Sequence, residues 1–180
     1  MSEAAAATYH TQQIEAFEDS AADVITAITM NYAEEAIGIA RAAERAGMPV
    51  VISFTVETDG RLPTGQDLRA AVEQVDSATS RYPSYYMINC AHPTHFENVL
   101  IGGEAWTRRI RGLRANASPR SHAELNESTE LDIGNPAELA THYAQLKSRL
   151  PQLNVMGGCC GTDHRHLEQI AVACLPLFSS

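Results

Sequence analysis

The sequence predicts an α/β fold with a parallel β-sheet, and three observations carry this prediction. Five short stretches rich in β-branched and apolar residues recur along the chain, and stretches with apolar residues at helical spacing lie between them. The 180 residues are 44% hydrophobic, enough to bury one core, so we expect a single domain over residues 1–180. Because parallel neighbours cannot be joined by tight turns, the alternation favours a parallel sheet with right-handed crossovers.

The predicted elements follow one another in a regular βα order. The strands are expected at residues 22–29, 49–56, 84–90, 110–118 and 153–158. The first helix has a start at Asn31 and a stop at Gly47, and similar starts precede the helical patterns of residues 64–80 and 135–150. Asn135 is the expected N-cap of the last of these, with Pro136 in its first turn.

The two longest loops are the candidates for functional segments. Residues 91–109 and 119–134 each follow the carboxyl end of a predicted strand. Barrels and open α/β sheets place their chemistry at this end of the strands. We therefore expect a functional site beside these loops.

Composition excludes several classes of partner. The chain has 13 basic and 22 acidic residues, a net charge of −9, and no run rich in lysine or arginine, so we expect no nucleic-acid partner. No apolar segment approaches the roughly 20 residues that a membrane helix needs, so no membrane partner is expected. The first ten residues lack the basic start and apolar stretch of a secretory signal, which predicts a cytoplasmic protein.

Three of the four cysteines point to a metal site. Cys90 ends one predicted strand, and Cys159 and Cys160 follow another, so all three sulfurs are expected at the same rim of a parallel sheet. Zinc bound by three protein ligands keeps its fourth position open, which is the catalytic pattern. The alternative is that these cysteines are small buried hydrophobes, and spacing alone does not decide between the two. Cys174 lies in an apolar helix end and is expected in the core.

Other residues near the cysteines have more than one interpretation. Gly157 and Gly158 precede the cysteine pair, where we expect them to allow a sharp turn and a close approach to a ligand. Histidines at strand ends commonly cap helices or support metal ligands, and a proton-shuttle role is the alternative. The histidines in question are His92, His95, His164 and His166.

Two motifs resemble the zinc–cysteine signatures of the homocysteine S-methyltransferase family. These are INCAHP from Ile88 to Pro93 and GGCCGTDHRHLEQI from Gly157, within a similarity that runs over about residues 9–174. The family fold is a (β/α)8 TIM barrel. The resemblance starts just ahead of the family's fourth strand, so it implies a partial barrel with about the last five βα units. It also implies a Zn²⁺ cofactor held by Cys90, Cys159 and Cys160.

The resemblance further implies an activity. Homocysteine would bind as a zinc thiolate and take a methyl group from a small-molecule donor to give methionine. The donor would carry this methyl group on a positively charged sulfur or nitrogen, or would be a folate or a cobalamin. Asn89 and Asn116, at matching strand ends, are the implied substrate-binding residues. The family's fourth strand often ends in Phe-Glu-Thr, whereas residues 27–29 are Ala-Ile-Thr here, and Glu57 and Glu34 are the candidates to supply the carboxylate.

A five-stranded portion of a barrel has two open edges. Strands near Val24 and Val155 would expose unpaired backbone groups and an apolar interior. We therefore expect self-association, association with a separate N-terminal half, or poor solubility. Two alternatives to an active methyltransferase stay open at this stage: a catalytically silent remnant that still binds zinc, and a non-catalytic α/β interaction domain with reduced core cysteines.

Overall fold

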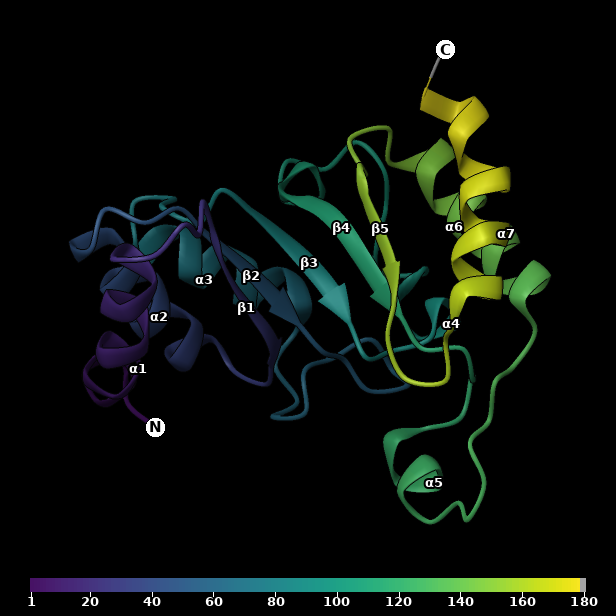
Figure 1. Cartoon of the computed structure of the whole chain (residues 1–180), viewed down its shortest axis with the longest axis horizontal. Coiled ribbons are helices and arrows are strands. Elements are labelled where there is room, and N and C mark those ends of the chain that lie inside the picture. Colours follow the sequence, from purple (N-terminus) through teal and green to yellow (C-terminus); the bar gives the residue numbers. More distant parts are fainter. Residues whose placement is uncertain (179–180) are drawn as a thin grey trace.

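The computed structural model describes residues 1–178 and shows strands and helices in alternation (Figure 1). The strands are β1 (Ile25–Met30), β2 (Val50–Phe54), β3 (Tyr85–Asn89), β4 (Ile110–Ala115) and β5 (Val155–Gly158). The longer helices are α1 (Glu3–Glu18), α2 (Ala33–Arg45), α3 (Leu68–Ala78), α6 (Pro136–Arg149) and α7 (His164–Cys174). The short helices are α4 (Pro93–Phe96) and α5 (His122–Asn126), with 3-10 turns at Thr107–Arg109 and Leu175–Phe178.

The sheet confirms the predicted architecture. Its order is β1-β2-β3-β4-β5, and every neighbouring pair is parallel. Sequential parallel strands joined by helices on one side form a portion of a (β/α)8 barrel. All five carboxyl ends therefore lie at one rim, and the helix α5 projects beyond that rim (Figure 1).

The core lies between the sheet and its helices. Its fully buried side chains come from both layers and include Ile37, Phe54, Tyr86, Leu113 and Tyr143. Burying a large apolar side chain contributes about 1.5–3 kcal/mol relative to leaving it exposed. This single core ties the five βα units into one body.

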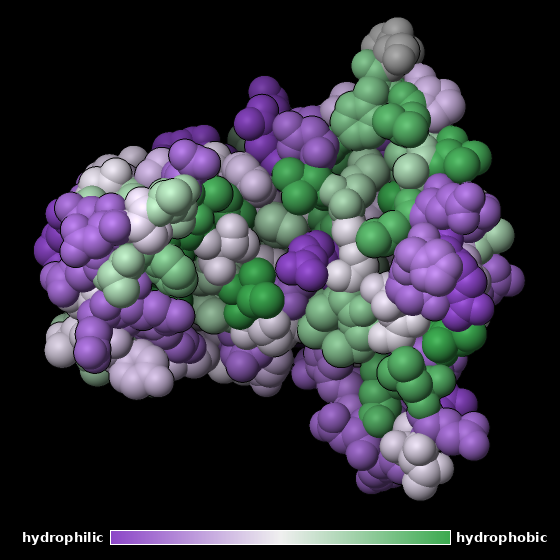
Figure 2. Space-filling model, viewed as in Figure 1, coloured by the Kyte–Doolittle hydropathy of each residue, from purple (hydrophilic) through white to green (hydrophobic). Residues whose placement is uncertain are grey.

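The other face of the sheet is partly open. On β1 the side chains of Thr26 and Ile28 are exposed, and every residue of β5 is only half-buried. Figure 2 shows hydrophobic residues interspersed with polar ones across the front of the molecule. Within residues 1–178, β1 and β5 each pair with one neighbour only, so the expected open edges are present.

The helix boundaries agree with the sequence in part. Asn135 caps α6 by accepting hydrogen bonds from the amides of Ala137 and Glu138, and Pro136 is its first residue, as predicted. Gly47 follows α2 with a left-handed φ of +67°, the expected stop. The predicted start at Asn31 is wrong, because α2 begins at Ala33 with Tyr32 as N-cap and no side-chain capping bond.

The helix α1 was not predicted. Its alanine-rich sequence buries few residues and lacks a broad apolar stripe, so it carries a weak periodic signal. It packs against α2, and a Cβ at Gly38 would lie 2.5 Å from the Cβ of Ala6. Close packing of small residues therefore holds α1 in place.

None of the helices in residues 1–178 combines the length and the apolar character that crossing a membrane requires.

Candidate metal centre

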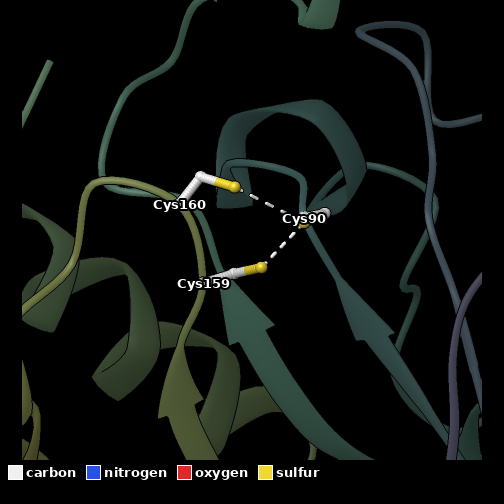
Figure 3. Close-up of side chains that lie close together, drawn as sticks. All are labelled: Cys90, Cys159 and Cys160. Carbon is white, nitrogen blue, oxygen red and sulfur yellow. Dashed lines mark hydrogen bonds between the residues drawn. The ribbon is translucent and has the colours of Figure 1, made fainter. Parts of the chain in front are cut away.

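The sulfurs of Cys90, Cys159 and Cys160 lie together at the carboxyl rim of the sheet (Figure 3). All three atoms fall within 4.8 Å of one another. The Cys90 sulfur is 2.7 Å from that of Cys159 and 3.7 Å from that of Cys160. Among residues 1–178 this is the one group of three or more potential metal-ligating side chains brought this close together.

The end of β4 holds both cysteine-bearing segments in place. The Cys90 amide donates to the Arg114 carbonyl, and the Cys159 amide donates to the Ala115 carbonyl. The Ala117 amide in turn donates to the Cys160 carbonyl. Because β4 lies between β3 and β5, one strand end sets the distance between thiols that are about 70 residues apart in sequence.

Cys90 adopts a strained backbone conformation. Its φ is +55°, in the left-handed region that residues other than glycine rarely occupy. Such a conformation costs on the order of 1–3 kcal/mol and persists only where the surroundings impose it. The amide bond to Arg114 is one such constraint, and it fixes the turn from which the thiol reaches the other two cysteines.

The two glycines before the cysteine pair act differently from the prediction. Neither Gly157 nor Gly158 has a left-handed φ, and both lie in β5. Gly158 is required for space, because a Cβ there would lie 2.1 Å from the Thr162 Oγ1. That hydroxyl donates to the Cys159 carbonyl and closes the turn into α7. The sharp turn itself occurs at Gly161, whose φ is +76°.

The short contact between Cys90 and Cys159 gives the two thiols different pKa values. A hydrogen bond from the Cys90 thiol lowers the pKa of Cys159 to about 5. Burial opposes this change, and hydrogen bonds with Cys160 add to it. The same hydrogen bond, together with burial and the neighbouring thiols, raises the pKa of Cys90. The hydrogen bond between the two thiols therefore favours ionisation at Cys159, and the thiolate is the form in which a cysteine binds a cation.

The two asparagines predicted to bind substrate lie at the rim and make structural hydrogen bonds. Asn89 is 2% exposed; its Oδ1 accepts from the Thr29 amide and the Ser53 hydroxyl, and its Nδ2 donates to Thr29 Oγ1. It thus joins the ends of β1, β2 and β3. Asn116 Oδ1 accepts from the Cys160 amide, and its side chain lines the cavity beside the sulfurs.

A cavity of about 490 Å³ opens beside the cysteines, and its wall includes Cys90, Cys160 and Asn116. Segments from the ends of all five strands contribute to it, as does the helix α5. The carboxylates of its wall belong to Glu57, Glu130 and Asp132. Glu57 accordingly is near the sulfurs, whereas Glu34 accepts a hydrogen bond from Gln74 outside this wall.

His122 joins the loop after β4 to the rim. Its Nε2 lies 2.5 Å from the Cys90 carbonyl, and its Nδ1 lies 3.2 Å from Glu57 Oε1. Burial lowers the pKa of His122, but the bonds to the Cys90 carbonyl and to Glu57 outweigh it and raise the pKa overall. His122 has no local signal in the sequence, because Glu57 and Cys90 lie 65 and 32 residues away from it in the chain.

The four histidines near the cysteines in sequence lie away from the sulfur cluster. His92 caps α4 with its Nδ1, and His95 Nε2 meets the Pro119 carbonyl. His164 is exposed at the start of α7. His166 is fully buried, forms a capping box with Asp163 and contacts the Ile133 carbonyl through Nε2. Capping roles are therefore what the structure shows for His92 and His166.

Cys174 is 2% exposed in the core, as predicted.

Residues 1–174 match the homocysteine S-methyltransferase family. The chain belongs to this family. Its fold is similar to that of the apo form of the homocysteine methyltransferase MmuM from Escherichia coli, with a TM-score of 0.72 and 19% sequence identity. That match covers 96% of this chain and 58% of the Escherichia coli chain, so the present chain spans little more than half the length of that enzyme.

The cysteine cluster of this homocysteine S-methyltransferase family member suits zinc. A zinc ion at the usual distance of about 2.3 Å from each sulfur would hold the sulfurs about 3.8 Å apart. The Cys90 and Cys160 sulfurs are 3.7 Å apart, and the Cys159 sulfur is closer to that of Cys90. One of these two sulfur–sulfur distances therefore already matches the spacing that zinc requires, and all three sulfurs lie within 4.8 Å of one another. The lowered pKa of Cys159 supplies the first thiolate.

Proposed function

We propose that this chain binds one Zn²⁺ through Cys90, Cys159 and Cys160 and is the zinc-bearing part of a homocysteine S-methyltransferase. The observation that carries the proposal is the convergence of three sulfurs within 4.8 Å beside a cavity of about 490 Å³. A set of three protein ligands leaves one position for a substrate sulfur. Membership of the family supplies the acceptor, homocysteine, and the product, methionine.

The residues of the rim would each contribute to methyl transfer. Zinc, when bound, supplies a Lewis acid that keeps a substrate thiol in its nucleophilic thiolate form at neutral pH. The three cysteines bind the metal, and Asn116 holds the Cys160 backbone while it faces the cavity. We propose Asn116 and, less directly, Asn89 as groups that orient the substrate, which raises the rate by aligning donor and acceptor.

The charge of the cavity favours one class of methyl donor. Its wall carries three carboxylates and, among the described lining residues, no lysine or arginine. A donor with a positive charge on sulfur or nitrogen is attracted to such a wall, whereas a polyanionic folate is repelled. We therefore propose a small cationic methyl donor.

The proposed assembly and location follow from the fold and the thiols. The two edge strands support association with a second copy or with a separate chain that supplies further βα units. Free thiols at the site require a reducing compartment, which supports the cytoplasm.

Zinc content tests the metal part of this proposal. We expect close to one zinc per chain by elemental analysis in the purified protein and none in the Cys90→Ser, Cys159→Ser, Cys160→Ser variant. Cys174→Ser is the matched control, since that cysteine lies in the core away from the cluster, and it should retain zinc. A folded chain without zinc would contradict the proposal.

A catalytically silent zinc-binding protein is the second candidate. It is favoured by Ile28, an exposed apolar side chain on β1 at the position where the resemblance implies a carboxylate, and by the open sheet edges. The two candidates differ in turnover. Formation of methionine from homocysteine and a sulfonium methyl donor, dependent on bound zinc, supports the methyltransferase; zinc binding without turnover, even with added βα units, supports the silent protein.

A further inference from the structure

The hydroxyl of Tyr143 lies between the ends of β4 and β5. It accepts a hydrogen bond from the Ala115 amide at 2.8 Å and donates one to the Gly157 carbonyl at 2.7 Å. The fully buried side chain extends from α6, in the helix layer, toward the sheet. Its hydroxyl therefore lies where β4 and β5 end.

The two groups that Tyr143 contacts are natural partners of each other. Ala115 pairs with Gly158 in the parallel register of β4 and β5. In a regular parallel ladder this pairing directs the Ala115 amide to the Gly157 carbonyl. The hydroxyl of Tyr143 adds one further hydrogen bond to each of these two groups. The strands are therefore linked through a side chain directly before the cysteines begin.

The next hydrogen bonds along these strands hold the segments that contain the cysteines. The Cys159 amide donates to the Ala115 carbonyl, one peptide group beyond the amide that Tyr143 holds. The Cys160 amide donates to Asn116, whose own amide bonds to the Ala91 carbonyl next to Cys90. A change in the spacing of Ala115 and Gly157 is therefore transmitted to the separation of the sulfurs.

We propose that Tyr143 is a positioning residue for the sulfur cluster, because its hydroxyl sets the spacing of β4 and β5 and so the place of Cys159 and Cys160 relative to Cys90. This inference rests on the proposed function in one respect, that the cluster is a metal site. Without the hydroxyl the ends of β4 and β5 lose this additional link, so Cys159 and Cys160 are held less firmly in their place relative to Cys90.

A matched pair of tyrosine variants tests this role. Tyr143→Phe removes the hydroxyl between the strands, and Tyr86→Phe removes an equally buried hydroxyl that donates to Asp76. Both variants of the full chain lose hydrogen bonding in the core, so a purely structural effect appears in both. Zinc affinity is measured by competition with a chelator, and the absorption spectrum of the cobalt(II)-substituted protein reports the geometry of the thiolates.

We expect Tyr143→Phe to weaken zinc binding by about 10- to 100-fold, the range found for residues that orient metal ligands. The cobalt spectrum should change in Tyr143→Phe and remain that of the wild type in Tyr86→Phe. Replacing Tyr143 by 4-aminophenylalanine keeps the donor to the Gly157 carbonyl but is a weak acceptor for the Ala115 amide, so that protein should bind zinc more tightly than Tyr143→Phe.

Three results would overturn the inference. Equal zinc affinity and cobalt spectra in Tyr143→Phe and wild type would do so and leave the metal site standing. A 4-aminophenylalanine protein that binds zinc no better than Tyr143→Phe would do the same. Absence of zinc from the wild-type chain would remove the proposed function and this inference together.

Discussion

Asn89 shows how one residue at a strand end can hold a rim together. Its amide joins Thr29 and Ser53 to β3 and is almost fully buried. Asn89→Ala should lower the free energy of unfolding by about 1–3 kcal/mol, because buried donors and an acceptor lose their partner. Urea denaturation measures this. Asn126→Ala, at an exposed position on α5, is the control and should change stability by less than about 0.5 kcal/mol. An Asn89→Ala protein of unchanged stability but weakened substrate binding would instead favour a direct substrate role.

His92 predicts a specific loss of stability in mild acid. Burial, with the nearby His142 and His95, lowers the pKa of His92 from 6.5 to about 4. The unfolded chain therefore takes up a proton at a higher pH than the folded chain, so stability is full above about pH 6.5 and falls as the pH drops to about 4. A shift of this size corresponds to a loss of at most about 3 kcal/mol.

The variant His92→Asn isolates this effect. Asparagine keeps an N-cap acceptor for α4 but does not titrate in this range. Urea midpoints measured between pH 7 and pH 4 should fall less steeply in the variant than in the wild type. Identical pH dependence in the two proteins would show that other groups control acid stability.

At the scale of elements, the turn from β5 into α7 depends on one glycine of an adjacent pair. A Cβ at Gly158 would collide with Thr162, whereas a Cβ at Gly157 would have its nearest neighbour at 3.5 Å, on the Arg114 side chain. Gly158→Ala should therefore lower the free energy of unfolding by about 1–3 kcal/mol and reduce zinc content. Gly157→Ala should be tolerated in both measurements. If the two variants behave alike, the space requirement at Gly158 is not the cause.

The elements also show which signals in the sequence carry structural information. Strands β1 to β5 were predicted because apolar runs between helical patterns are local features, and α6 was predicted because Asn135 and Pro136 mark its start. The start of α2 was misplaced, because Asn31 lies two residues before the first helical residue and makes no capping bond. The helix α1 is held by tertiary packing of small residues against Gly38, which leaves almost no periodic signal.

At the scale of the whole molecule, the sulfur cluster could be predicted and its supporting contacts could not. Parallel strands place their carboxyl ends at one rim, so the positions of Cys90, Cys159 and Cys160 followed from strand order alone. The contacts of His122 and Tyr143 depend on where α5 and α6 lie against the sheet. Such placements arise from packing over long sequence distances, for which a single sequence has no pattern.

The open edges of the sheet predict concentration-dependent association of the whole molecule. The edge strand β1 exposes Ile28, which is 46% exposed, beside unpaired backbone groups. Sedimentation velocity over a range of concentrations should show species larger than the 19.5 kDa chain. Ile28→Lys should shift the distribution toward the monomer, because a charge on an edge strand opposes pairing with another copy. Ser77→Lys is the control: it adds the same charge at an exposed position on α3, which connects the inner strands β2 and β3, and should leave association unchanged. A monomer at every concentration would contradict this prediction and show that the open edges of the sheet do not cause association.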